Sequence, residues 1–163
     1  LGAGARVLLL SVVDYASGEL VQLSATGDER RVGATGLAGP VGLALDAQGR
    51  LLVSEATAGR LLRIEPASGA REVPASRLSQ PEGIAVLPDG AIAIAEVGAR
   101  RLSLVAARGG RSRVIARDLP VGQMFTRTPA PVFMPTGVAA GDDGTIYVSG
   151  DRDNSLLAFR PRK

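Results

Sequence analysis

Acidic residues recur at a fixed interval along this chain. Asp14, Glu55 and Glu96 follow one another at steps of 41 positions, and a further glutamate, Glu82, comes directly after a proline. Carboxylates accept hydrogen bonds, hold hard cations and act as general acids or bases. Asp14, Glu55 and Glu96 therefore share one position of a repeat, whereas Glu82 does not. The repeated acids and Glu82 are interpreted separately below.

Histidine and cysteine are both absent from the 163 residues. Their absence excludes disulfides, thiolate and imidazole metal ligands, and every nucleophile pair that needs histidine or cysteine. Carboxylates, hydroxyls and arginine remain for chemistry. Any bound metal would therefore be a hard cation with oxygen ligands, such as calcium.

Three stretches of the sequence share one pattern. They read PVGLALDAQGRLLVSE at 40–55, PEGIAVLPDGAIAIAE at 81–96 and PTGVAAGDDGTIYVSG at 135–150. In each, glycines stand two and nine positions after the proline, and the apolar runs between them indicate strands. A polar pair before the second glycine predicts a hairpin turn. Another apolar run follows each copy, and Asp14 with its following ELVQL belongs to an earlier copy.

A repeat of about 40 residues with four short strands per unit is typical of a β-propeller blade. We therefore predict an all-β fold, a β-propeller of four-stranded antiparallel blades. The predicted units are a partial blade at 1–38, whole blades at 39–79 and 80–119, an inserted loop at 120–134 and a partial blade at 135–163. Two whole and two incomplete blades do not close a ring. We expect part of a longer ring, or open blade edges that pair with another copy.

The pattern P-x-G-[IVL]-A-V-x-x-x-G-x-[IL]-x-[IV]-[AS]-[DE], followed by R-[IL]-x-x-[IVF], resembles the blades of NHL-repeat proteins. It is also similar to the six-bladed propellers of the gluconolactonase and senescence-marker-protein group. The resemblance implies that this chain is part of a six-bladed ring. Gly150 and Ser155 stand where the family pattern has an acid and an arginine, so the last blade is the least typical.

In the gluconolactonase-like group, an acid in a PEG-type opening helps to hold a divalent cation in the channel. The resemblance implies Glu82, Asp151 and Asn154 as the ligands here, and calcium as the cation. Such a cation would polarise a lactone or ester carbonyl and activate water, which makes a hydrolase. The same opening occurs in ordinary NHL blades, and Asn154 is the sole asparagine of the chain. We therefore favour a structural Glu82 and expect no cofactor, with calcium as the alternative.

The repeated acids Asp14, Glu55 and Glu96 resemble a triad, yet their shared register argues against one. A residue repeated in every blade performs the same task in every blade. We expect these carboxylates to accept hydrogen bonds from loop amides and from Arg60 or Arg101, because buried charges are normally paired.

Strand direction assigns the loops to two rims. The blade-to-blade links and the loops between second and third strands share one rim, which carries the acids, Thr136 and the insertion. The large apolar side chains of the insertion are those of Met124, Phe125, Phe133 and Met134. They would form an apolar edge that acts as a lid or contacts a partner, or they would only cap the core. We expect a protein partner or a small ligand at this rim.

Arginine is dense between Arg100 and Arg117, which raises nucleic acid as a partner. Recognition of single strands needs stacking aromatics, and aromatics make up 3% of this chain, so we do not favour it. The chain has no apolar run that would span a bilayer and no signal-peptide pattern, so we expect a soluble protein without a membrane partner. We predict a non-catalytic binding propeller or scaffold, with a calcium-dependent lactonase or esterase as the alternative and a nucleic-acid binder as the third possibility.

Overall fold

The computed structural model describes residues 9–122 and 135–161. These residues form four antiparallel sheets, each built from strands that are consecutive in sequence. No helix among them is long and apolar enough to cross a membrane. The predicted all-β fold of two complete and two incomplete blades is confirmed, and each sheet is called a blade below.

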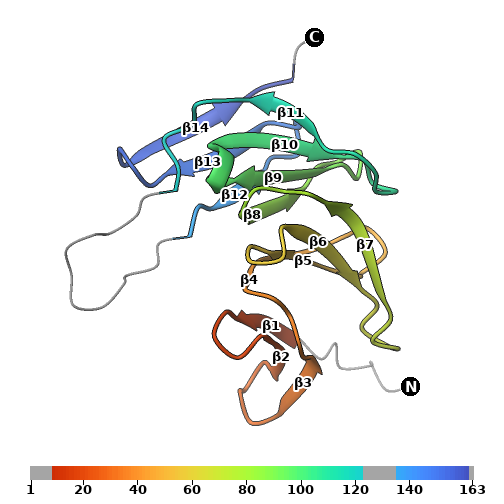
Figure 1. Cartoon of the computed structure of the whole chain (residues 1–163). Helices are drawn as coiled ribbons and strands as arrows, with labels where there is room; N and C mark the ends of the chain where they lie inside the picture. The colour runs from red at the N-terminus through yellow and green to blue at the C-terminus, as the bar shows by residue number, and fades with distance from the viewer. Residues whose placement is uncertain (1–8, 123–134, 162–163) are drawn as a thin grey trace, which may run out of the picture.

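The blades follow one another along the chain (Figure 1). Blade 1 comprises β1 (Leu9–Asp14), β2 (Glu19–Ser24) and β3 (Arg30–Ala34). Blade 2 comprises β4 (Pro40–Leu45), β5 (Leu51–Glu55), β6 (Arg60–Ile64) and β7 (Arg71–Ser76). Blade 3 comprises β8 (Pro81–Val86), β9 (Ile92–Glu96), β10 (Arg101–Val105) and β11 (Arg113–Ala116), with a 3-10 turn at Val97–Ala99. Blade 4 comprises β12 (Val138–Ala140), β13 (Ile146–Gly150) and β14 (Ser155–Phe159).

The first hairpin of each repeat turns at the glycine nine positions after the proline. Gly49, Gly90 and Gly144 have φ values of 77°, 81° and 78°. Glycine adopts this left-handed conformation without the steric cost that a Cβ brings. The repeated glycine is therefore explained by the turn that each hairpin needs.

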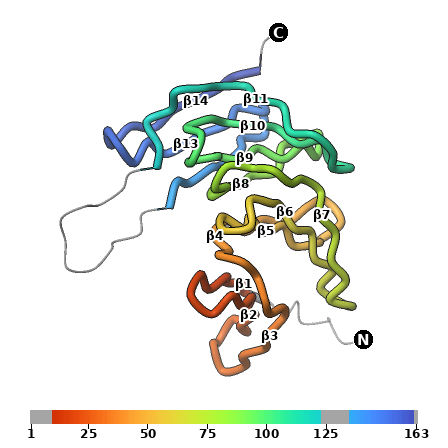
Figure 2. Tube along the Cα trace, in the orientation of Figure 1, coloured from red at the N-terminus to blue at the C-terminus, as the bar shows by residue number. Residues whose placement is uncertain are grey.

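The blades bury both faces of their middle strands. In β5, Leu51 and Val53 pack with blade 1, whereas Leu52 packs with blade 3. Alternate side chains of a strand point to opposite faces, so a strand between two neighbours is apolar on both. This explains why the LLVSE of β5 and the IAIAE of β9 are buried throughout. Figure 2 shows the resulting succession of layers along the Cα trace.

The glycine two positions after each proline lies where the first strands of neighbouring blades meet. A Cβ on Gly42 would collide with the carbonyl oxygen of Glu82, and a Cβ on Gly83 with that of Thr136. Gly137 in blade 4 has only the Ser149 hydroxyl nearby, at 3.5 Å from such a Cβ. The glycine thus permits backbone contact between blades, and in blade 4 the described residues supply no further blade to contact.

Candidate functional site

Glu82 joins three blades. It follows Pro81 at the start of β8, and its carbonyl oxygen accepts a hydrogen bond of 2.5 Å from the hydroxyl of Ser54 in blade 2. Its carboxylate oxygen Oε2 accepts a hydrogen bond of 2.7 Å from the backbone N–H of Thr136, at the entry to blade 4. The residue is only 7% exposed. Glu82 is therefore held from both sides at the rim predicted from the strand directions.

Asp151 and Thr136 complete a small cluster around Glu82, which we call the mouth cluster. Burial raises the pKa of Glu82 above its ordinary value, the charge of Asp151 raises it further, and the N–H of Thr136 opposes the rise. The hydroxyl oxygen of Thr136 is buried, and the Thr136 side chain also opposes the rise in the pKa of Glu82. The mouth cluster thus combines two acids that repel each other with a buried hydroxyl.

Asn154 is exposed in the turn between β13 and β14, not buried in the mouth cluster. Its φ is 56°, and the equivalent turn positions of the other blades, Gly18, Gly59 and Arg100, also have positive φ values of 66°, 61° and 47°. Asparagine tolerates this left-handed corner better than most residues. The turn geometry therefore accounts for an asparagine here without a ligand role.

A calcium ion takes six to eight oxygen ligands. Of the three ligands implied by the family resemblance, Asp151 is near enough for its charge to raise the pKa of Glu82, whereas Asn154 is exposed. Across residues 9–122 and 135–161, no group of three or more acidic, histidine or cysteine side chains is placed to hold a metal ion. The described residues therefore present two carboxylates and one hydroxyl, which do not make a complete calcium site.

The repeated acids Glu55 and Glu96 are fully buried and hold the links between blades. Glu55 accepts a hydrogen bond of 2.6 Å from the N–H of Ala38 and forms an ion pair with Arg60. Glu96 accepts hydrogen bonds from the N–H of Ser79 at 2.8 Å, from Arg101 at 2.7 Å and 2.9 Å, and from the hydroxyl of Ser103 at 2.5 Å. Burial opposes ionisation of Glu96, but these donors outweigh it and lower its pKa.

Asp14, the third repeated acid, differs from the other two because it is exposed. It accepts hydrogen bonds from the N–H groups of Ala16 at 2.9 Å and Ser17 at 3.3 Å, within its own hairpin.

Four predicted rim residues, Met124, Phe125, Phe133 and Met134, lie outside the described residues. The predicted apolar edge therefore stays a prediction.

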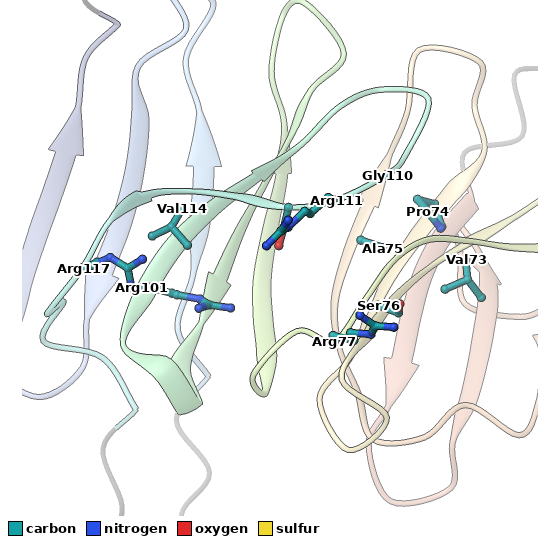
Figure 3. A pocket seen from close by; sticks show the side chains of 11 residues that line it. Val73, Pro74, Ala75, Ser76, Arg77, Arg101, Gly110, Arg111, Val114 and Arg117 are labelled. Atoms are coloured by element: carbon teal, nitrogen blue, oxygen red, sulfur yellow. The ribbon is translucent and has the colours of Figure 1, made fainter.

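A groove of about 790 Å³ lies between the outer strands of blades 2 and 3, and we call it the basic groove. Figure 3 shows Arg101 and Arg117 on the blade 3 side, Arg77 beside Ser76 on the blade 2 side, and Arg111 between them. The full lining is Val73, Pro74, Ala75, Ser76, Arg77, Arg101, Gly110, Arg111, Ser112, Val114 and Arg117, without a carboxylate. Arg101 is paired with Glu96 at 2.7 Å, whereas the other three arginines have no ion pair among the described residues.

Two hydrogen bonds fix the wall of the basic groove formed by the loop between β10 and β11. The N–H of Gly110 donates to the carbonyl oxygen of Pro74 at 2.8 Å. Arg63 of β6, which is 5% exposed, donates to the carbonyl oxygen of Ala107 at 2.6 Å and lies 3.3 Å from Asp46 and 3.2 Å from Glu72. The loop is thus attached to the neighbouring blade.

Sequence reasoning missed the basic groove, although it noticed the run of arginines that supplies Arg101, Arg111 and Arg117. Arg77 comes from the preceding blade, and nothing in the local sequence connects it to that run.

The role of Ser54 at Glu82 was also missed. The signal that could have found it is the serine that precedes the repeated acid position, which recurs as Ser149.

Comparison with known proteins gives the fold. No protein-family model matches the chain, and no curated protein matches its sequence. Among solved structures, a streptogramin B lyase superposes with a TM-score of 0.68 at 15% identity, over 95% of this chain and 52% of the lyase. A gluconolactonase of Xanthomonas campestris superposes with a TM-score of 0.64 at 19% identity, over 94% of this chain and 72% of that one. The chain has a β-propeller fold.

A further similar structure comes from a protein complex. A chain of a nidogen–laminin complex superposes with a TM-score of 0.64 at 16% identity, over 92% of this chain and 60% of that one. The chain spans about half the length of the streptogramin B lyase. At these identities the likeness concerns the fold alone, since one fold hosts many functions.

Proposed function

We propose that this propeller is a non-catalytic binding module whose basic groove recognises anionic groups. The observation that carries the proposal is the gathering of Arg77, Arg111 and Arg117 around a groove without a carboxylate in its lining. Guanidinium groups bind carboxylates and phosphates through paired, charge-assisted hydrogen bonds. Unpaired arginines in a concave site therefore favour a ligand that brings its own negative charges.

The acids of the chain support a binding role over a catalytic one. Glu55 and Glu96 are fully buried and engaged by arginines and loop amides, so a substrate cannot reach them. Glu82 uses its carboxylate to hold Thr136 of the next blade. These contacts give the carboxylates structural tasks, and the chain contains no histidine or cysteine to act in their place.

The test is thermal melting with and without inorganic triphosphate, for the wild type, Arg111→Gln and Arg113→Gln. A ligand that binds only the folded state raises the melting temperature. We expect a rise for the wild type and for Arg113→Gln, because Arg113 lies on β11 but does not line the groove. Arg111→Gln should reduce the rise. Equal rises in all three proteins, or none in the wild type, would reject the basic groove.

A hydrolase that uses a divalent cation is the second candidate function. It is favoured by the closeness of Glu82 and Asp151 and by the buried Thr136 hydroxyl, together with the fold shared with a gluconolactonase. Melting with millimolar calcium tests this candidate: a rise that Glu82→Gln abolishes would support it, and an unchanged melting temperature would count against it.

A further inference from the structure

We propose that the ligand of the basic groove is an extended acidic segment of a partner protein. The inference rests on the proposed function and names the kind of partner.

The arginines of the basic groove are distributed over its length. Arg77 and Arg117 directly follow β7 and β11, whereas Arg111 belongs to the loop at the opposite end of β10 from Arg101. A strand of five residues spans about 17 Å. The backbone positions of Arg101 and Arg111 are thus separated by the length of β10, which suits an extended peptide with several acidic side chains better than one small anion.

The surface between the arginines suits a peptide better than a nucleic acid. No aromatic side chain lines the groove, and single-stranded nucleic acids are normally held by stacking on aromatics. Val73, which is 49% exposed, and Val114 instead offer small apolar contacts. Ser76 and Ser112 add hydroxyls that can donate to or accept from a peptide backbone.

The edge of β7 favours recognition of the partner through its side chains over the addition of a strand to β7. Pro74 in the middle of β7 has no N–H, and its carbonyl oxygen already accepts from Gly110. This strand edge therefore lacks the continuous row of donors and acceptors that strand addition requires. Side-chain carboxylates reaching the arginines are then the main source of affinity.

Arg77 has a backbone conformation that a glycine would adopt more easily. Its φ is 59°, and the equivalent position in blade 1 is Gly36, with a φ of 69°. A left-handed conformation is unfavourable for a residue with a long side chain. The equivalent corner of blade 3 is Asp118, with a φ of 57°, so the left-handed turn belongs to the blade and what Arg77 adds to it is a cation beside the groove.

The experiment measures fluorescence anisotropy with a labelled peptide of about twelve residues that repeats Glu-Val-Glu-Ser, long enough to exceed one strand when extended. The proteins are the full chain, Arg111→Gln, Arg77→Gly and the control Arg113→Gln. We expect Arg111→Gln and Arg77→Gly each to weaken binding about threefold to tenfold. Arg113→Gln should change it less than about twofold, and added salt should weaken binding in every protein.

Arg77→Gly separates binding from folding. We expect this variant to melt at a higher temperature than the wild type while binding the acidic peptide more weakly, and damage to the fold cannot produce that combination. Unchanged peptide affinity in Arg77→Gly and Arg111→Gln would overturn the inference.

Two further probes separate the failure of this inference from the failure of the proposed function. If single-stranded oligothymidine binds more tightly than the peptide, with the same dependence on Arg111, the groove binds anions but the peptide inference is overturned. If the peptide fails and inorganic triphosphate still raises the melting temperature of the wild type but not of Arg111→Gln, the peptide inference again falls alone. If neither the acidic peptide, nor oligothymidine, nor inorganic triphosphate binds, both proposals fall.

Discussion

The carboxylate of Glu82 accepts a hydrogen bond of 2.7 Å from the backbone N–H of Thr136, which lies 54 residues further along the chain. This bond connects the first strand of blade 3 to the entry of blade 4 across a buried position. The same residue accepts the hydroxyl of Ser54 at its carbonyl oxygen. The contacts between three successive blades therefore meet at one side chain and its peptide group.

Replacing Glu82 tests this connection. Glu82→Ala removes the acceptor and leaves the buried N–H of Thr136 unsatisfied, which should lower the free energy of unfolding by about 1–3 kcal/mol. Glu82→Gln keeps an acceptor oxygen, so its loss should be less than about 1 kcal/mol. Urea unfolding of the three proteins measures the difference, and equal losses in the two variants would show that the hydrogen bond contributes nothing.

Glu82 and Glu96 should contribute to the free energy of unfolding with opposite dependence on pH. The pKa of Glu82 is raised from its ordinary value of 4.5, so the folded state binds the proton more tightly than the unfolded state. Its contribution to stability therefore falls as pH rises above about 4.5. The pKa of Glu96 is lowered from the same ordinary value, so its contribution is complete above about 4.5 and is lost as pH falls below it.

Unfolding measured across this pH range, for the wild type against Glu82→Gln and Glu96→Gln, checks both signs. Relative to the wild type, Glu82→Gln should gain stability as pH rises and Glu96→Gln should gain stability as pH falls. If the stabilities of both variants relative to the wild type changed in the same direction with pH, the opposite pKa shifts of Glu82 and Glu96 would be contradicted.

Ser54 and Ser149 form a matched pair of hydroxyls. Each accepts a hydrogen bond of 2.7 Å from the N–H of the repeated glycine in its own blade, but only Ser54 also donates to a neighbouring blade, at 2.5 Å, among the described residues. Ser54→Ala should cost about 1–3 kcal/mol of unfolding free energy, because the half-buried N–H of Gly42 and the buried carbonyl oxygen of Glu82 both lose a partner. Ser149→Ala should cost less, and chemical denaturation compares the two.

The repeated glycines offer a second matched set. Gly42→Ala and Gly83→Ala place a Cβ against the backbone of the next blade, so each should lower the free energy of unfolding by about 1–3 kcal/mol or more. Gly137→Ala meets no such backbone and should change stability by about 0.5 kcal/mol at most. If all three substitutions had the same effect in thermal melts, close approach of the blades would not be the reason for the glycine.

Much of the fold could be predicted from the sequence because its signals are local. Strand patterns and the turn glycines depend on residues that are near in sequence, and the 41-residue step from Glu55 to Glu96 repeats these local patterns at a fixed interval. The reason for the glycine after each proline could not be seen this way. It depends on the distance between the backbones of two blades, as at Gly42 and Glu82.

The site was predictable only in part, for the same physical reason. The acid directly after the proline of blade 3 drew attention to Glu82, but its donor, the N–H of Thr136, belongs to a different blade. Arg77 meets Arg111 and Arg117 across a gap between blades. The residue pattern within one strand does not predict which side chains of neighbouring blades line the same groove.

The most direct test of the central claim is a titration of the isotope-labelled chain with inorganic triphosphate, followed by amide chemical shifts in NMR spectra. The basic groove predicts that the largest shifts fall on residues 73–77 and 110–117, and that the amides of Glu82, Thr136 and Asp151 move little. Shifts centred on that mouth cluster instead, with the groove unmoved, would contradict the claim.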